Sequence, residues 1–327
     1  MGKNKTRLQQ NNTDLQAIKV TVEGLPVLPT PQIVTIDGVQ HSEDLAFEST
    51  PCAITLPEMT SPNRMKNGSA IALNGEIHVL GYYESTYTVG KNHYKFNGTS
   101  WTQVSTLPYY FGSGSAVVLN GEIHILGGVQ YGSAGDYVKN HYKFNGTSWT
   151  QVSTLPYGFA FGSAVVLNGE IHILGGSGNG TSHYKFNGTS WTQVSTLPYA
   201  FYNGSAVVLN GEIHILGSSS STNYTKHYKF NGTSWTEVST LPIEQDNSRQ
   251  RFIVLNNEIH YYTGTPGNTM NVYKFNNGVW SLYQKRLSYV NTNNNPAVVN
   301  TNEDIYILGT YNIYDFIKID KAYRLMS

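Results

Sequence analysis

The sequence predicts an all-β fold built from six copies of one four-stranded unit. The string Asn-Gly-Glu-Ile-His-(Ile/Val)-Leu-Gly begins at Asn74, Asn120, Asn168 and Asn210 and recurs in weaker form at Asn256 and Asn302. The isoleucine of each copy follows the previous one by 46, 48, 42, 46 and 46 residues. A nearly fixed period of this length indicates a repeat protein whose units stack on one another.

A second string follows the first within each copy. His-Tyr-Lys-Phe-Asn-Gly-Thr-Ser-Trp-Thr begins at His93, His141, His183 and His227. The fifth copy keeps only part of it, around Tyr273 and Trp280, and in the sixth Tyr323 takes the place of the tryptophan. Terminal repeats often differ in this way, so we interpret the sixth copy as a diverged repeat.

Turn signals divide each copy into four short strands, which we name a, b, c and d in chain order. The full repeats read Ser-Ala-Val-Val-Leu for strand a, Glu-Ile-His-Ile-Leu for b, His-Tyr-Lys-Phe for c and Trp-Thr-Gln-Val-Ser for d. Asn-Gly pairs join a to b and c to d. This pair favours a tight hairpin, because a type I′ turn needs positive φ at both central residues.

The repeat resembles the kelch family of β-propellers over residues 65–327. The resemblance rests on Gly127-Gly128 after strand b, on Tyr142 in strand c and on Trp149 in strand d, with their counterparts in other copies. It implies a six-bladed kelch-like propeller, with the tyrosines and tryptophans packed between radially arranged blades.

Residues 31–64 are expected to be a linker that also forms a strand. Their Cys52-Ala53-Ile54-Thr55-Leu56-Pro57 echoes the Gln-Val-Ser-Thr-Leu-Pro that ends strand d. This segment therefore either adds a strand where the ring closes or begins a partial seventh blade.

Residues 1–30 carry a helical pattern in place of the repeat. Leu8, Asn11, Leu15, Ile18, Val22 and Leu25 follow one another at spacings of three and four residues. This is the seam of a short coiled coil, and its composition favours three or more strands over two, as in a homotrimer. An ordinary surface helix remains the alternative. We therefore expect an N-terminal helical or extended segment that serves oligomerisation or attachment.

The same N-terminal segment resembles the start of tail-associated proteins from phages of Gram-positive gut bacteria. The resemblance rests on Lys5 to Ile18 followed by Gly24-Leu25-Pro26. It implies that residues 1–30 attach the chain to other tail proteins of a virion, with the propeller displayed as a head. It also implies a chain made in the bacterial cytoplasm.

The parity of the strands separates the two faces of the predicted disc. The a–b and c–d turns share one face and the b–c and d–a loops share the other. The loops of the second face vary between copies and are rich in Tyr, Ser, Gly and Asn, which is the composition of adaptable recognition surfaces. The candidate binding residues on it are Tyr82, Tyr83, Tyr87, Tyr109, Tyr110, Phe111, Tyr131, Tyr137, Tyr157, Phe159, Tyr199, Phe201, Tyr202, Tyr224, Arg249 and Arg251.

No catalytic residues, metal ligands or cofactor are predicted. The repeated histidines of strands b and c follow from duplication and are not expected to converge on one ion. The copper oxidases among kelch-like propellers need a Tyr–Cys cross-link, but the single cysteine, Cys52, precedes the repeats. Glu84, Asp136, Glu244 and Asp246 could supply an acid pair, but nothing in the sequence pairs them.

Charge balance and hydropathy limit the classes of partner that the sequence predicts. The 21 basic residues balance the 21 acidic ones, which gives no electrostatic argument for nucleic acid. No signal peptide and no apolar run long enough to span a membrane is apparent. We expect a non-enzymatic binding protein that recognises a bacterial surface glycan or protein. A carbohydrate-active enzyme and a structural decoration module remain alternatives, and the loop aromatics could simply fill the channel entrance.

Overall fold

The computed structural model describes residues 34–36, 39–41, 54–55, 68–81, 90–129, 137–218, 225–242, 252–265, 269–288, 297–300, 304–308 and 316–320. The chain forms two compact units, Met1–Glu48 and Ser49–Ser327. In the first, β1 (Val34–Ile36) pairs antiparallel with β2 (Val39–His41). Strands are the only regular elements of the described ranges, so no helix there could cross a membrane. The helix predicted in residues 1–30 lies outside them.

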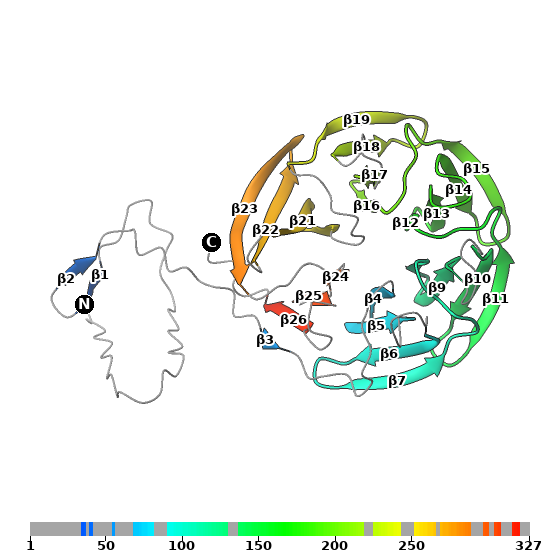
Figure 1. Cartoon of the computed structure of the whole chain (residues 1–327), viewed down its shortest axis with the longest axis horizontal. Coiled ribbons are helices and arrows are strands. Elements are labelled where there is room, and N and C mark those ends of the chain that lie inside the picture. Colours follow the sequence, from blue (N-terminus) through cyan, green and yellow to red (C-terminus); the bar gives the residue numbers. More distant parts are fainter. Residues whose placement is uncertain are drawn as a thin grey trace. The chain divides into compact units, whose positions relative to one another are not determined.

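The second unit is a β-propeller, as the repeats predict. Five blades are four-stranded sheets made of consecutive strands in the order a, b, c, d. Strand a lies innermost and strand d forms the outer rim (Figure 1). The first three blades are β4 (Ser69–Leu73), β5 (Glu76–Leu80), β6 (Asn92–Phe96) and β7 (Trp101–Thr106); β8 (Ser115–Leu119), β9 (Glu122–Leu126), β10 (Asn140–Phe144) and β11 (Trp149–Thr154); and β12 (Ser163–Leu167), β13 (Glu170–Leu174), β14 (Ser182–Phe186) and β15 (Trp191–Thr196).

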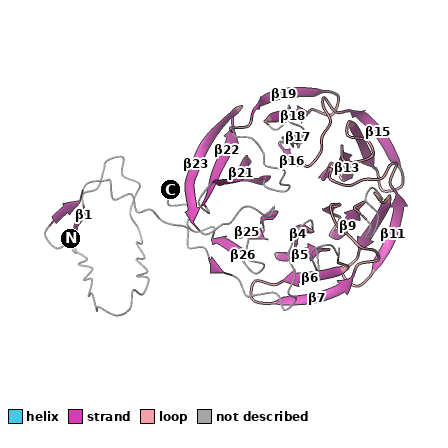
Figure 2. Cartoon of the chain, viewed as in Figure 1, coloured by secondary structure: helices cyan, strands magenta, loops and turns pink. Residues whose placement is uncertain are grey.

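The fourth and fifth blades complete the run of consecutive strands. Figure 2 shows that these sheets too are built from strands arranged around the ring. The two blades are β16 (Ser205–Leu209), β17 (Glu212–Leu216), β18 (Lys226–Phe230) and β19 (Trp235–Thr240); and β20 (Phe252–Leu255), β21 (Glu258–Thr265), β22 (Thr269–Asn276) and β23 (Val279–Ser288).

The expectation of six complete blades within residues 65–327 needs correction, because only five are built from consecutive strands. The C-terminal strands β24 (Ala297–Asn300), β25 (Asp304–Leu308) and β26 (Phe316–Asp320) form a further sheet with β3 (Ile54–Thr55). Ile317 and Lys318 pair antiparallel with Thr55 and Ile54. The fourth strand of this composite sheet therefore comes from the N-terminal side of the repeats.

Asn-Gly turns join strands a and b as the sequence predicts. At the turn between β8 and β9, Asn120 has φ 52° and Gly121 has φ 77°. Leu119 and Glu122 pair directly across this turn, which closes a two-residue hairpin. Positive φ at both central residues is the property of a type I′ turn, and Asn and Gly adopt it at low cost.

Hydrophobic cores fill the spaces between neighbouring blades. Between the first two blades, Leu80, Phe111, Ile123, Ile125 and Phe144 form one buried cluster. Equivalent clusters join each following pair up to the fifth blade. Strand b is buried on both faces, with Ile123 and Leu126 of β9 both fully inaccessible. No blade could keep these residues from water by itself, so the ring must form as a unit.

Packing explains why a glycine follows strand b. A Cβ placed on Gly127 would lie 1.9 Å from the carbonyl oxygen of Phe159, which belongs to the next d–a loop. Gly128 N–H donates to that same oxygen at 2.6 Å. Only a residue without a side chain lets the loop approach the strand this closely.

A polar chain of side chains links each full blade to the next. In the first blade, His78 Nδ1 lies 2.8 Å from His93 Nε2, and His93 Nδ1 lies 2.9 Å from Ser105 Oγ. Trp149 of the second blade donates its indole N–H to Ser105 Oγ at 2.9 Å. The same arrangement recurs from the second to the fifth blade. The predicted role of the tryptophans between blades is thus confirmed.

Burial keeps these histidines neutral. Desolvation is the main cause that lowers the pKa of the strand b histidines, such as His78 and His124, to about 4. It lowers the pKa of the strand c histidines, such as His93 and His141, to about 3. An added proton would also disturb the hydrogen bonds between these side chains. The indole of Trp149 can only donate, and the two facing nitrogens of each histidine pair share a single proton.

The histidine chains predict loss of stability in mild acid. The native pKa values of about 3 to 4 lie below the ordinary value of 6.5. The unfolded state therefore binds more protons, and stability that is complete above pH 6.5 falls as the pH is lowered. Each of the four pairs should contribute to this loss.

Urea unfolding at pH 7.0, 6.0 and 5.0 measures this effect. The free energy of unfolding should decrease steeply over this range, where most carboxylates remain ionised. His141→Val copies the fifth blade, where Val272 occupies the strand c position that is histidine in the other four. This variant should show a shallower pH slope than the native chain. Equal stability at pH 7.0 and 5.0 would rule out the proposed linkage.

Candidate binding face

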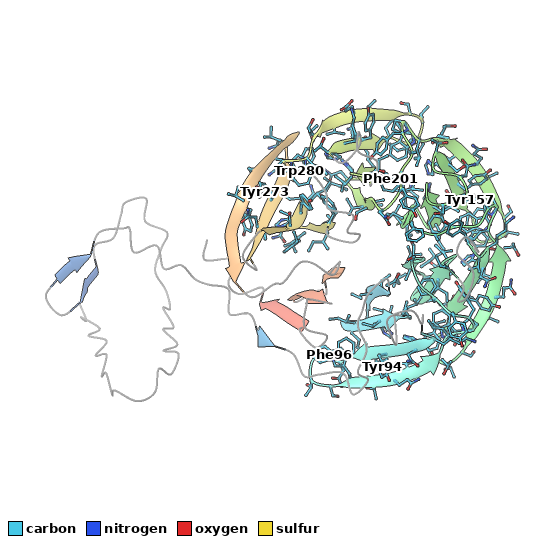
Figure 3. The ribbon with its side chains drawn as sticks, viewed as in Figure 1. Tyr94, Phe96, Tyr157, Phe201, Tyr273 and Trp280 are labelled. Carbon is cyan, nitrogen blue, oxygen red and sulfur yellow. The ribbon has the colours of Figure 1, made fainter. Side chains whose placement is uncertain are left out.

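The d–a loops have constant positions that belong to the core. Each of the d–a loops 107–114, 155–162 and 197–204 contains a tyrosine followed two residues later by a phenylalanine. The tyrosines are Tyr109, Tyr157 and Tyr199, and the phenylalanines are Phe111, Phe159 and Phe201. The three phenylalanines are fully buried. Figure 3 shows Phe201 and Tyr157 among the side chains that fill the spaces around the ring. The prediction that these phenylalanines bind a ligand is therefore corrected, since they have no accessible surface to offer.

The constant tyrosines are tied to the next blade through their hydroxyls. Tyr109 and Tyr157 donate to the carbonyl oxygens of Gly127 and Gly175 at 2.8 Å, and Tyr199 donates to Gly217 O at 3.1 Å. Burial is the main cause that raises the pKa of each hydroxyl. These groups stay protonated and bonded, which makes them structural contacts between blades. Their predicted binding role does not suit this geometry.

Some variable positions of the same loops carry aromatic residues that reach the surface. Tyr110, Phe161 and Tyr202 are all partly exposed, and the other loops hold different residues at their positions. Tyr110 lies beneath the ammonium of Lys91, with Nζ 4.7 Å from the ring centroid. Phe161 is absent from the candidates drawn from the sequence. Aligning the loops position by position would have found it, because it stands where Ser113 and Asn203 stand.

Three aromatic rings from three loops meet at this face. Phe161 stacks on Tyr202 with ring centroids 5.0 Å apart and an interplanar angle of 22°. Tyr137, from the loop between β9 and β10, approaches Phe161 edge-on at 6.2 Å and 86°. All three rings remain partly exposed. We call Tyr137, Phe161 and Tyr202 the aromatic platform.

Backbone bonds hold the loops together beneath the platform. Phe161 N–H donates to Ser113 O, and Asn203 N–H donates to Phe161 O, both at 2.8 Å. All three residues have positive φ, at 59°, 61° and 55° for Ser113, Phe161 and Asn203. The left-handed backbone at this position is therefore a shared feature of the loops, set by bonds that are independent of the side chain.

A small cavity lies where three d–a loops meet their strands a. Its volume is about 30 Å³, and it is lined by Gly114, Ser115, Ala116, Gly162, Ser163, Ala164 and Gly204. This volume suits about one water molecule. A larger ligand cannot enter this cavity.

The opposite face satisfies its own polar groups. In the c–d turn of the second blade, Asn145 Oδ1 accepts from the backbone N–H of Thr147 at 3.0 Å and of Ser148 at 2.9 Å. Lys143 pairs with Glu122 at 2.9 Å beside the a–b turn. The other full blades repeat these contacts. Identical, internally bonded turns give this face little to distinguish one ligand from another.

Several predicted residues cannot be placed. Tyr82, Tyr83, Tyr87, Tyr131, Tyr224, Arg249 and Arg251 lie outside the described residues. The carboxylates considered for an acid pair, Glu84, Asp136, Glu244 and Asp246, also lie outside them. Across the described ranges, no three metal-ligating side chains come together.

Comparison with known proteins supports the fold class. No protein-family model and no curated protein sequence matches the chain. Among solved structures, one described as the structure of YjhT superposes with a TM-score of 0.63. The two share 14% identity, over 80% of this chain and 95% of that one. At this identity the similarity concerns the fold alone. The propeller is thus the class of protein that structure and comparison agree on.

A matched pair of substitutions separates core tyrosines from surface tyrosines. Tyr157→Phe removes the hydroxyl that donates to Gly175 O and leaves that buried carbonyl without this bond. It should lower the free energy of unfolding by about 1 kcal/mol. Tyr202→Phe removes a hydroxyl at a partly exposed position and should change it by less than about 0.5 kcal/mol. Urea unfolding measures both, and equal losses would contradict this assignment.

Proposed function

We propose that the chain is a non-enzymatic binding protein that recognises a bacterial surface polymer with its b–c and d–a loop face. The observation that carries the proposal is the difference in role between constant and variable positions of the d–a loops. The constant tyrosines bond the next blade and the constant phenylalanines fill the core, whereas Tyr110, Phe161 and Tyr202 are partly exposed aromatic residues at variable positions. Partly exposed aromatic residues at variable positions of a shared scaffold are the pattern expected of a recognition surface.

The aromatic content of the face supports a binding role in energetic terms. Tyrosine provides a large contact area with few rotatable bonds, so little conformational entropy is lost on binding. The scaffold beneath is rigid, because Tyr109 and its counterparts bond each loop to the following blade. A preformed surface avoids much of the ordering cost of binding.

A loop-face variant tests the binding role. Tyr110→Ser, Tyr137→Ser and Tyr202→Ser together should weaken binding to cell-wall preparations from Gram-positive bacteria at least about tenfold, because exposed aromatic contacts dominate such interfaces. Sedimentation of the protein with the cell walls measures it. The control carries Thr147→Ala, Thr189→Ala and Thr233→Ala on the opposite face and should bind as the native chain does. No binding by the native chain would overturn the proposal.

We further propose that residues 1–30 attach the protein to a phage tail, with the propeller as the displayed head. The support is the seam of Leu8, Leu15 and Ile18 and the resemblance of this segment to tail-associated proteins. A seam of this composition favours three strands. Sedimentation equilibrium of the full chain should therefore give the mass of a trimer. A monomer at micromolar concentration would contradict the oligomeric stem.

We also infer that the composite sheet serves as the sixth blade of a kelch-type ring. Its innermost strand, β24, contacts β20 on one side and β4 on the other. Joining the two ends of the repeat region in one sheet would close the ring with ladder hydrogen bonds and leave no free edge. Electron microscopy down the channel should show six spokes, and five would overturn this inference.

A further inference from the structure

Phe161 stands at a backbone position that does not suit a phenylalanine. Its φ of 61° is in the left-handed region. Asparagine enters this region readily, and a bulky side chain does so only at a cost. The equivalent positions hold Ser113 and Asn203. The bonds that set the backbone here, Phe161 N–H to Ser113 O and Asn203 N–H to Phe161 O, would form with any side chain.

The ring of Phe161 is not needed to fill the core. The core role of this loop belongs to Phe159, which is fully buried, whereas Phe161 stays partly exposed. What the ring provides is the centre of the aromatic platform, since both Tyr202 and Tyr137 contact it. A strained residue whose side chain builds a surface feature points to function, because strain persists where it serves a site.

The surroundings of Phe161 and Tyr202 indicate a neutral ligand. The loop segments 155–162, 175–181 and 197–204 contain no charged residue, whereas in the segment of Tyr137, Asp136 precedes it and Lys139 follows two residues later. The second of these is joined to the first by Ser177 N–H donating to Ala160 O at 2.7 Å, next to Phe161. It also presents Gly178 and Asn179 to solvent. The adjacent groups are therefore backbone amides, an asparagine amide and tyrosine hydroxyls, which bond neutral hydroxyls.

We propose that Tyr137, Phe161 and Tyr202 form a stacking platform for one neutral sugar ring. The axial C–H groups of a pyranose pack on an aromatic face while its hydroxyls bond polar groups at the edge. This inference rests on the binding function proposed above and assigns the ligand class and central residue of that face.

Phe161→Asn provides the test, because it places at this position the residue that the next loop already has. Relief of the left-handed strain should offset the lost ring packing, so the melting temperature should stay within about 2 °C of the native value. Binding of neutral hexose or N-acetylhexosamine tetrasaccharides, followed by titration calorimetry, should weaken about tenfold. Tyr202→Leu, whose backbone has no such strain, should weaken it similarly.

Each outcome decides the question. A Phe161→Asn variant that binds as tightly as the native chain would overturn the platform, and a large loss of melting temperature would make Phe161 a packing residue. Thr147→Ala lies on the opposite face and should keep the sugar affinity of the native chain. If the native chain binds cell walls and polyglycerol phosphate but none of the neutral sugars, the sugar platform fails and the binding function stands. If it binds none of these, both fail.

Discussion

Burial between blades is the constraint on which the rest of the structure depends. Strand b of a full blade has a hydrophobic side chain on each face, as Ile123 and Leu126 show, and only two neighbouring blades can cover both. The d–a loop completes the same contact, since Phe159 packs in the cluster that joins the second and third blades. The backbone of that loop in turn approaches Gly127 so closely that no side chain would fit there. The d–a loop that carries Phe159 is therefore held by the same packing as the strands.

This constraint also separates structural residues from surface residues on the candidate face. Each of the d–a loops 107–114, 155–162 and 197–204 places a phenylalanine in the core and bonds a tyrosine hydroxyl to the next blade, so these two positions are constant. The positions between and after them can differ, and in some loops they carry partly exposed aromatic residues. Tyr110, Phe161 and Tyr202 fall at those positions. The proposed recognition surface thus consists of residues that the packing between blades does not require. The same packing holds their backbone rigid.

The neutral buried histidines fix how neighbouring blades align, and they also make the ring sensitive to acid. Each chain from histidine to histidine to serine to tryptophan crosses from one blade to the next, as from His78 to Trp149. The directional bonds fix how neighbouring blades align, which apolar contacts alone do more loosely. The same bonds require that the histidines stay unprotonated. A ring joined by such chains is best suited to neutral surroundings.

The sequence by itself determined the repeat, the four strands of each unit, the a–b turns and the propeller class. Each of these follows from local chemistry repeated along the chain: Asn-Gly favours a type I′ turn, and alternating apolar residues favour a strand. The c–d turns differ from the prediction, because four residues separate the paired Phe144 and Trp149 and only Gly146 among them has positive φ. Sequence also separated the two faces by parity. Tertiary structure decided which loop aromatics are buried, because burial depends on the neighbouring blade and not on residue type. Tyr109 and Tyr110 are adjacent and chemically identical, yet one bonds Gly127 in the interior and the other meets Lys91 at the surface. Only the fold could distinguish them, and only the fold brought Phe161 between Tyr137 and Tyr202.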